Sequence, residues 1–167
     1  MPTIPKDETR SSLYDGTQVS KADARMEANG TIDELNCHIG LLITELPKEW
    51  HEEFHTIQRH LFAIAAVIAG YSHPRMLPGT DEVAQLRIRI AEMEEQTGPF
   101  RGFILPGGCR AAAQAHICRA VCRRAERAVV ATGCHPELVP YLNRLSGFFF
   151  SCAQLLNIIN KTDEINL

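Results

Sequence analysis

Apolar residues recur along most of this chain at spacings of three and four, which is the period of an amphipathic helix. The most regular stripe lies within residues 23–46: Ala28, Ile32, Leu35, Ile39, Leu42 and Leu46. Similar stripes lie within residues 49–70, residues 80–97 and residues 137–160, and a further helical run extends from about residue 108 to residue 131. Proline or glycine interrupts the chain between these segments. The pattern predicts five helices with short connections.

The first 22 residues show no sustained period, and they contain Pro2, Pro5 and Gly16 among many polar residues. We interpret this segment as an arm that is flexible, or that is ordered only against a ligand or a partner. No strand of useful length is predicted anywhere in the chain. The chain therefore divides into an arm, residues 1–22, and an all-α five-helix antiparallel bundle, residues 23–167, in the up-down arrangement of ferritin-like proteins.

The last predicted helix is apolar over more of its surface than one packing face requires, because Phe148, Phe149 and Phe150 point in three directions. In a chain of this length, such excess indicates a second buried face. We therefore expect an oligomer.

Composition narrows the class of protein. Its 167 residues are 45% apolar and 22% charged, which is typical of a single globular domain. The formal net charge of −3 argues against nucleic-acid binding. The longest uncharged apolar run, residues 61–70, is too short to span a membrane, and no targeting leader is recognised, so a cytoplasmic location is expected. The six cysteines form no CxxC pair, and we interpret them as reduced thiols.

The fourth predicted helix carries an unusual cluster of arginines. Five arginines and no lysine lie between residues 110 and 127: Arg110, Arg119, Arg123, Arg124 and Arg127. Three charged residues of this run, Arg119, Arg123 and Glu126, share one helix face. Such a face is either solvated or a site for an anion, because guanidinium groups bind phosphate and carboxylate bidentately. The preceding turn, residues 105–108, is either a plain helix start or a second source of anion-binding N–H groups.

Asp33 lies beside the apolar stripe of the first helix. Its carboxylate has two interpretations at this stage. It belongs to a solvated helix edge, or it pairs with one of the arginines of the fourth helix.

Residues 51–55 read His-Glu-Glu-Phe-His and match the HExxH pattern of zinc metallopeptidases. In that pattern His51 and His55 bind zinc, and Glu52 acts as the base. The same stretch is also an ordinary polar start for the second helix, and the sequence marks no third ligand. A zinc metallopeptidase is thus a rival interpretation.

Four blocks of the chain, in order, resemble the PduO-type ATP:cob(I)alamin adenosyltransferases. They span most of the chain: Val19-Ser20-Lys21 with RMEANGTIDELN at residues 25–36, Ile57-Gln58 with Leu61-Phe62, FILPGG at residues 103–108 with CRAVCRRAER at residues 118–127, and YLNRLS at residues 141–146.

The resemblance implies a five-helix bundle that forms a homotrimer with active sites between subunits. It implies transfer of the 5′-deoxyadenosyl group of ATP to the cobalt of reduced cobalamin, with release of tripolyphosphate and with Mg²⁺ as the divalent cation. It also implies contact with a cobalamin reductase or with an enzyme that uses adenosylcobalamin.

The resemblance also assigns roles by position. Catalytic roles fall on Arg123 and Phe103. The ATP site includes Arg123 and four further residues: Lys21, Glu126, Asn143 and Arg10. Phe103 matches the phenylalanine that displaces the lower ligand of cobalamin, which makes cobalt(II) easier to reduce. Asp33 and Arg119 match a pair that joins two subunits, and no residue is assigned to a protein-bound metal.

Two departures from the family pattern fall on the nucleotide side. The family's N-terminal loop reads roughly TRTGDxGTT, whereas Thr9-Arg10 is followed here by a shorter segment without the TGDxG core. Gly147 replaces the aspartate that follows the NRLS block. A non-catalytic relative that binds a corrinoid or a nucleotide therefore stands as an alternative, unless residues such as Arg10, Ser11, Ser12 and Lys21 replace the missing phosphate contacts.

Overall fold

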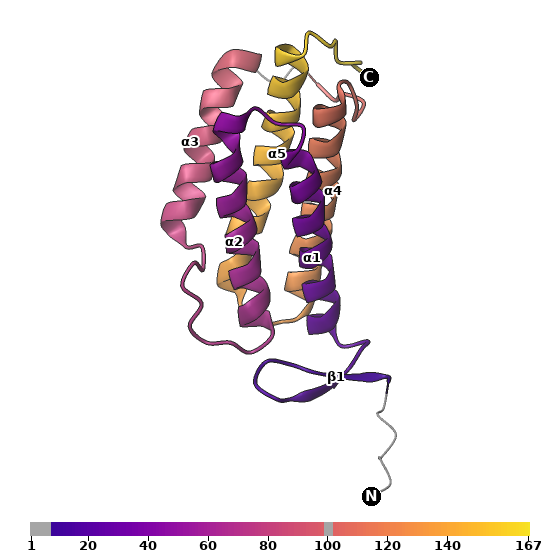
Figure 1. Ribbon diagram of the computed structural model, residues 1–167, viewed down its shortest axis with the longest axis vertical. Helices are drawn as coiled ribbons and strands as arrows, with labels where there is room; N and C mark the ends of the chain where they lie inside the picture. Colours follow the sequence, from indigo (N-terminus) through magenta and orange to yellow (C-terminus); the bar gives the residue numbers. More distant parts are fainter. Residues whose placement is uncertain (1–7, 99–101) are drawn as a thin grey trace, which may run out of the picture.

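The computed structural model describes residues 8–98 and 102–167, and five α-helices account for most of them. The helices are α1 (Ala24–Ile43), α2 (His51–Ile68), α3 (Thr80–Thr97), α4 (Arg110–Ala131) and α5 (Val139–Ile159). Two 3₁₀ turns, η1 (Lys48–Trp50) and η2 (Pro136–Leu138), precede α2 and α5. The predicted all-α bundle and its five helices are confirmed, with helix ends a few residues inside the predicted limits (Figure 1).

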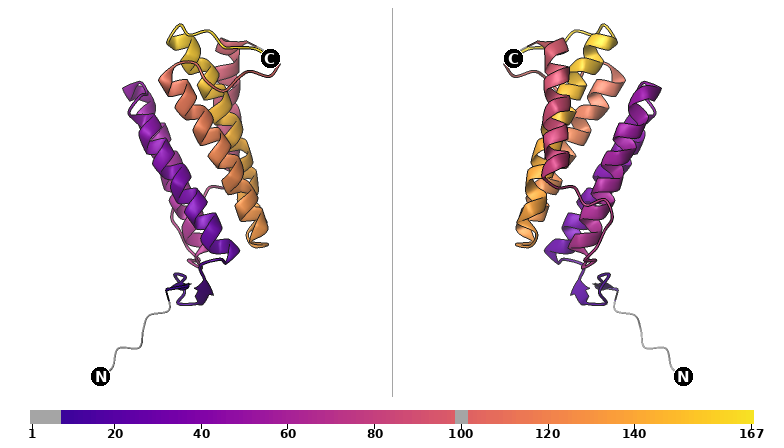
Figure 2. Two further views of the ribbon diagram at one scale, coloured as in Figure 1. Left: turned by 90° about the vertical axis from the view of Figure 1, so that its right-hand side faces the viewer. Right: turned by 90° about the vertical axis from the view of Figure 1, so that its left-hand side faces the viewer.

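The helices form two layers. Figure 2 shows α1 and α2 as one layer, and α3, α4 and α5 as the other. The main contacts between helices join α4 to α5, α1 to α4, α3 to α5 and α1 to α2. α5 thus lies between α3 and α4, which explains why its apolar surface is so broad.

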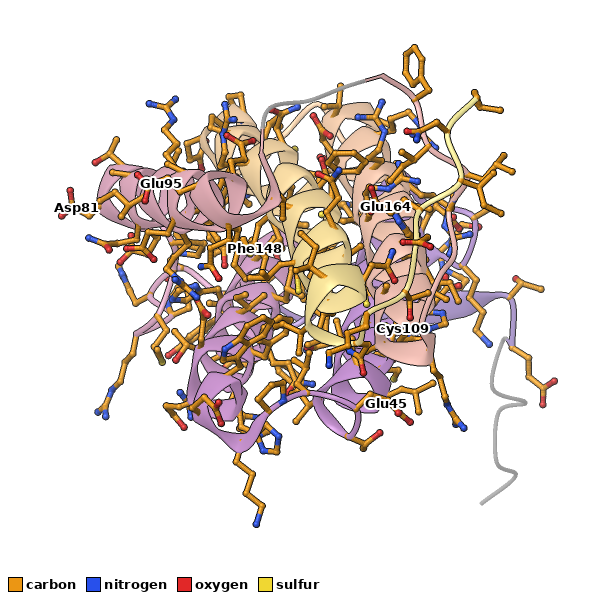
Figure 3. All side chains as sticks on the ribbon, turned by 90° about the horizontal axis from the view of Figure 1, so that it is seen from above. Glu45, Asp81, Glu95, Cys109, Phe148 and Glu164 are labelled. Carbon is orange, nitrogen blue, oxygen red and sulfur yellow. The ribbon has the colours of Figure 1, made fainter. Side chains whose placement is uncertain are left out.

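The aromatic residues of α5 divide between the core and the α4 contact. Phe148 and Phe149 are both buried, and each ring packs against Phe54 of α2, with centroid distances of 5.6 and 6.5 Å. Phe150 is half-buried, and its ring meets His116 of α4. Seen along the bundle axis, Phe148 lies inside, whereas Asp81 and Glu95 of α3 lie at the outside (Figure 3).

The arm contains more structure than we expected. Its described part forms an antiparallel pair, β1 (Arg10–Ser12) and β2 (Gln18–Ser20). Leu13 and Val19 are buried, and the backbone N–H of Tyr14 donates to the carbonyl of Ala69 at the end of α2. Strands of three residues are too short to show an alternating pattern, so the prediction of no strand was wrong here.

The hairpin lies at the end of the bundle where α1 begins, and the C-terminal segment lies at the opposite end (Figure 1). α4 and α5 run in opposite directions between these two ends. No helix in the described part of the chain is both long enough and apolar enough to cross a membrane.

Candidate functional site between α4 and α5

A pocket of about 250 Å³ lies where the second half of α4 meets the first turns of α5. Its lining consists of Arg123, Glu126, Arg127, Val130 and Asn143. The side-chain amide of Asn143 donates a hydrogen bond of 2.9 Å to Oε1 of Glu126. Three of the residues that the family resemblance assigns to the ATP site therefore line one pocket, although they lie up to 20 positions apart in the sequence.

The pocket presents positive charge that is not neutralised within the chain. Arg123 and Arg127 are exposed, and neither side chain makes a hydrogen bond or ion pair with another described residue. Val130 adds an apolar surface that is 58% exposed. Two guanidinium groups beside an apolar wall can bind an anion that also carries an uncharged part, and the Glu126–Asn143 pair adds a hydrogen-bond acceptor and a donor.

Two larger pockets lie elsewhere, and neither offers an unpaired cation among the described residues. One, of about 410 Å³, has no basic residue in its described lining, and the other, of about 500 Å³, lies between α2 and α3. There Arg89 contacts Glu53 at 2.7 Å, and the ring of His60 lies 2.9 Å from the hydroxyl of Tyr141. Because these groups satisfy one another, the smaller pocket on α4 is the better candidate for an anionic substrate.

Lys21 and Arg10 are not among the residues that line the α4–α5 pocket. Both belong to the hairpin, and the guanidinium of Arg10 donates to the carbonyl of Gln18 at 2.8 Å. Lys21 is exposed, and its backbone N–H donates to Thr9. Within one chain, the structure therefore brings together only some of the residues predicted to bind ATP.

Phe103 lies in the segment before α4 and is 77% exposed. The α4–α5 pocket lies near the far end of α4, the helix that follows the Phe103 segment. Arg123 lies thirteen residues beyond Arg110, where α4 begins, which corresponds to about 20 Å along the helix axis. Within one chain, the predicted cobalamin residue and the predicted nucleotide pocket thus lie toward opposite ends of α4.

Asp33 and Arg119 do not pair within the chain. Asp33 is exposed and makes no hydrogen bond or ion pair with another described residue. An ion pair between α1 and α4 is formed instead by its neighbour Glu34, which contacts Arg124. Sequence spacing could not distinguish these two acidic residues, because both lie on the polar side of α1.

Arg119 is a half-buried cation without a carboxylate partner in the described chain. Its Nε donates a hydrogen bond of 3.4 Å to Nδ1 of His116, an uncharged acceptor that supplies no counter-charge. Burial, and then the charge of Arg123, lowers the pKa of Arg119. A buried guanidinium is stable when a counter-charge reaches it.

His116 of α4 lies next to Arg119, and no pattern in the sequence singles it out. Its side chain is buried, and its Nε2 has no hydrogen-bond partner among the described residues. Burial, and then the nearby charge of Arg119, lowers its pKa from the ordinary value to about 4. Its position three residues before Arg119 on the same helix was the only available signal.

The zinc interpretation has no support in the geometry. Nε2 of His51 lies 3.2 Å from the carbonyl of Leu46, and Nδ1 of His55 lies 3.1 Å from Oε1 of Gln58. In the described residues, no three His, Cys, Asp or Glu side chains are grouped so that they could hold a metal ion. A catalytic zinc needs three protein ligands, so the HExxH match is best explained as the polar start of α2.

Two N–H groups at the start of α4 are satisfied within the chain. The N–H of Cys109 donates to Oδ1 of Asn157 at 2.9 Å, and the N–H of Ala112 is capped by the Cys109 sulfur at 3.4 Å. These two donors are not available to an anion, and anion binding by the N–H groups of residues 107 and 108 stays a prediction.

Comparison with known proteins gives a consistent result. The model of a family described as cobalamin adenosyltransferase matches residues 1–156. A Cupriavidus metallidurans protein named cobalamin adenosyltransferase is 46% identical over 153 residues, which cover 87% of this chain and 81% of that protein. The corrinoid adenosyltransferase of Bacillus subtilis is 38% identical over 85% of this chain and 79% of its own length.

The fold also matches solved structures. A variant of the PduO-type ATP:corrinoid adenosyltransferase from Lactobacillus reuteri, complexed with cobalamin and ATP, superposes with a TM-score of 0.88. The two chains are 24% identical, and the match covers 96% of this chain and 95% of that one.

Proposed function

The chain belongs to the cobalamin adenosyltransferase family and is an ATP:corrinoid adenosyltransferase, and we propose that its nucleotide site is the pocket between α4 and α5. The observation that supports this placement is the convergence of Arg123, Glu126 and Asn143 on one pocket. In the reaction, the electron pair of cobalt(I) forms a bond to C5′ of ATP. The C5′–O5′ bond breaks, and tripolyphosphate leaves with the electron pair of the broken bond.

Cobalt(I) is the nucleophile, so the protein needs no nucleophilic side chain. Its contribution is to hold the two substrates in line and to stabilise the charge that builds on the leaving phosphates. In this proposal the guanidinium of Arg123, which is exposed and has no partner within the described chain, binds the triphosphate. Arg127 adds a second positive charge to the same pocket wall.

Glu126 and Asn143 bind the uncharged part of the nucleotide in this proposal. Their mutual hydrogen bond of 2.9 Å fixes both side chains before any substrate arrives. The remaining carboxylate and amide oxygens accept hydrogen bonds, which suits the hydroxyl groups of a ribose. Preorganised groups of this kind lose little conformational entropy on binding.

Phe103 acts on the cobalamin in this proposal, by taking the place of the lower ligand of cobalt. One reaction joins the two substrates, so the residues that bind each must converge. Phe103 and Arg123 are separated along α4 by about 20 Å of helix and the turn before it. We therefore place each active site between two chains, with Phe103 of one chain opposite the α4–α5 pocket of its neighbour.

Two further observations support an assembly of several chains, which we propose is a homotrimer. Large apolar side chains on the outside of the bundle are exposed, including Leu41, Phe62 and Ile117. Arg119 is a half-buried cation without a carboxylate partner in the described chain, and Asp33 is an exposed carboxylate without a cation. Pairing Asp33 of one chain with Arg119 of the next would supply both missing partners.

Lys21 and Arg10 complete the nucleotide site in this proposal, by reaching the triphosphate from the hairpin of a neighbouring chain. The family's usual N-terminal loop is shortened here, so these two cations and the hydroxyls of Ser11 and Ser12 replace its contacts. Mg²⁺ would enter bound to the triphosphate. No carboxylate cage is grouped in the described residues, and Mg²⁺ commonly binds through phosphates and water.

One observation favours a second candidate, a non-catalytic relative that binds corrinoid or nucleotide. The turn of the hairpin closes on itself, because Oδ1 of Asp15 accepts the N–H of Thr17 at 2.9 Å. This bond also lowers the pKa of Asp15, so its carboxylate is charged and would repel a triphosphate. A turn of this kind is a poor substitute for a phosphate-binding loop.

The two candidates are separated by one experiment. Purified protein, ATP, Mg²⁺ and chemically reduced cob(I)alamin are mixed without oxygen, and the absorption spectrum is followed. We expect the cob(I)alamin spectrum to be replaced by that of adenosylcobalamin, with one tripolyphosphate released for each turnover. Binding of both substrates without this change would identify the non-catalytic relative. A cytoplasmic location and a reductase partner that supplies cobalt(I) complete the proposal.

A further inference from the structure

The segment that carries Phe103 is fastened to the C-terminal residues by backbone hydrogen bonds on both sides. The N–H of Leu105 donates to the carbonyl of Ile165 at 2.8 Å, and the N–H of Leu167 donates to the carbonyl of Phe103 at 3.0 Å. Ile104 and Asn166 form an isolated antiparallel bridge between them. We call residues 163–167 the strap. This backbone pairing fixes the chain on both sides of Ile104 and therefore the point from which the Phe103 side chain projects.

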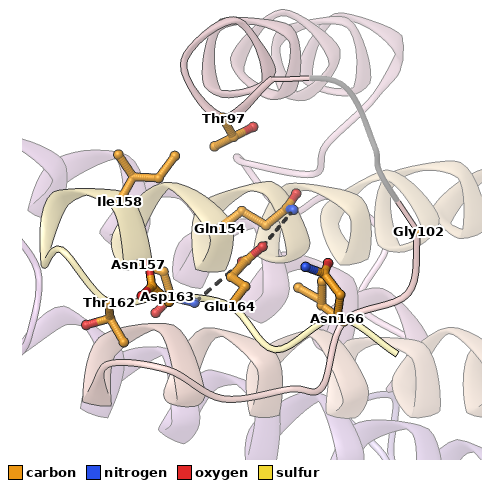
Figure 4. A pocket seen from close by; sticks show the side chains of 10 residues that line it. Thr97, Gly102, Gln154, Asn157, Ile158, Thr162, Asp163, Glu164 and Asn166 are labelled. Atoms are coloured by element: carbon orange, nitrogen blue, oxygen red, sulfur yellow. Dashed lines mark hydrogen bonds between the residues drawn. The ribbon is translucent and has the colours of Figure 1, made fainter.

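Asn157, near the end of α5, joins the strap to the turn before α4. Its side chain is only 1% exposed. Oδ1 accepts the N–H of Cys109 at 2.9 Å, and Nδ2 donates to the carbonyl of Gly107 at 3.3 Å. The same Nδ2 lies 3.4 Å from Oε1 of Glu164 at the start of the strap. Figure 4 shows Asn157 and Gln154 of α5 on either side of Glu164, with both contacts drawn.

The backbone at Gly108 lies directly against the side-chain amide of Asn157. Its φ of +99° lies in the left-handed region, where a side chain would be strained. A Cβ at this position would also lie 2.1 Å from Oδ1 of Asn157, which no real contact allows. The close approach of the turn to Asn157 therefore requires glycine at position 108.

We infer that Asn157 is a positioning residue for Phe103, acting through the Gly107–Cys109 turn and through Glu164 of the strap. The inference rests on the proposed role of Phe103 in displacing the lower ligand. Asn157 fixes one end of the Phe103 segment, four residues after the ring, and the strap fixes both sides of it. A catalytic side chain on a loop needs such support, because a small displacement from the productive geometry removes its effect.

A merely structural role for Asn157 would act on overall stability and on every activity alike. A positioning role acts only where Phe103 acts, which is in the step that starts from cobalt(II). Transfer from chemically pre-reduced cobalt(I) does not need the lower ligand to be displaced. The ratio of the rates from the two starting states therefore separates the two interpretations.

The experiment compares Asn157→Ala and Asn157→Asp with Asn160→Ala in the full-length protein. Asn160 is the matched control, because it is an exposed asparagine at the end of the same helix whose amide contacts only Leu156. The aspartate variant keeps the acceptor for Cys109 but loses the donor to Gly107 and Glu164. Two readouts are taken, the rate ratio from cobalt(II) and cobalt(I), and hydrogen exchange of the Leu105 and Leu167 amides by mass spectrometry.

We expect Asn157→Ala to speed exchange in the 103–107 and 163–167 segments by about tenfold, because buried hydrogen bonds are lost. We expect the rate from cobalt(II) to fall by about tenfold or more while the rate from cobalt(I) changes less than about threefold, since Phe103 acts only in the former. Asn160→Ala should match the wild type in both readouts. Equal loss from both starting states, or unchanged exchange, would overturn the inference.

A double variant makes the test independent of stability. If Asn157 acts through Phe103, then adding Asn157→Ala to Phe103→Ala causes no further loss from cobalt(II). Losses that multiply would show a separate role and contradict the inference. Failure of the wild type to use even cobalt(I) would refute the proposed function itself, while the exchange readout would still decide whether Asn157 holds the Phe103 segment.

Discussion

The side-chain amide of Asn143 donates a hydrogen bond of 2.9 Å to Glu126, and this bond joins the first turns of α5 to the second half of α4. It forms within one chain and without any ligand. The carboxylate is therefore held in place beside Arg123 and Arg127, in the same pocket. Because the acid and the amide are fixed together, the proposed nucleotide site has its hydrogen-bonding pattern already set, and in this proposal the two arginines supply the charge.

Replacing Arg123 with alanine should lower the rate of adenosyl transfer by about a hundredfold or more, which is the usual effect of removing one preorganised donor to a developing negative charge. The side chain is exposed, so helix content and assembly should not change. The rate is measured from the spectrum of adenosylcobalamin at saturating cob(I)alamin.

Arg87→Ala on α3 is a suitable control for Arg123→Ala, since it removes an exposed arginine far from the pocket. It should leave the rate within about twofold of the wild type, as most exposed substitutions do. Wild-type turnover in Arg123→Ala would remove this residue from the site.

Replacing Phe103 with alanine should slow transfer from cobalt(II) in the presence of a reductant far more than transfer from pre-reduced cobalt(I). In the proposed mechanism, the ring is needed only to make cobalt(II) reducible by displacing its lower ligand. Rates from the two starting states are compared with those of Ile88→Ala, which also removes an exposed apolar side chain. Equal losses from both states would rule out the lower-ligand role.

Replacing Asp33 with asparagine should lower activity by weakening the contact between chains, because Arg119 would then lack a counter-charge. Exchanging the two charges, with Asp33→Arg and Arg119→Asp in one chain, should restore part of the assembly and activity. Sedimentation velocity and the transfer assay are applied to the wild type, the two single charge reversals and the double variant. Together they give the coupling energy of this double-mutant cycle, which should be about 1 kcal/mol or more for a pair in contact.

Glu34→Gln provides the comparison for this cycle. It breaks the exposed ion pair with Arg124 inside one chain, which should cost less than about 1 kcal/mol of stability and leave the assembly intact. A charge-exchange cycle without coupling would show that Asp33 and Arg119 do not meet.

Stability should fall in acid partly because of His116. Its pKa in the folded protein is about 4, below the ordinary value of about 6.5, so the folded state binds fewer protons than the unfolded state between these two values. The stability that the neutral ring provides is therefore complete above about pH 6.5 and is lost as the pH falls toward 4, by an amount on the order of 1–2 kcal/mol.

The variant His116→Gln lacks the titrating ring and should lose less stability than the wild type over that pH range. Urea unfolding at several pH values, at one fixed protein concentration, measures the difference. Parallel pH profiles for the two proteins would show that the pKa of His116 is the same in the folded and unfolded states.

The helical part of the fold was predictable because each helix carries its own period. Ile32, Leu35 and Ile39 are all buried on one face of α1, as their spacing required. The hairpin was not predictable, because three-residue strands leave no pattern. Leu13 and Val19 are buried by contacts that the rest of the chain provides, so local sequence contains no sign of them.

The candidate site was predictable only in part. Spacing placed Arg123 and Glu126 on one helix face, but only the family resemblance connected Asn143 to them, since two helices must pack before the 2.9 Å contact exists. Asn157 was missed altogether. A lone asparagine in an apolar helix gives no indication that it will meet a turn 48 residues earlier in the chain.

Phe103 and Arg123 lie toward opposite ends of α4, and this separation affects how chains with different substitutions behave when they are mixed. If each active site takes Phe103 from one chain and Arg123 from its neighbour, two variants that are each impaired in the reaction from cobalt(II) can complement each other. When Phe103→Ala and Arg123→Ala chains are unfolded, mixed equally and reassembled, about one site in four receives both intact residues by random association in a cyclic assembly. Two copies of the gene with different lesions could therefore support a function that neither copy supports alone.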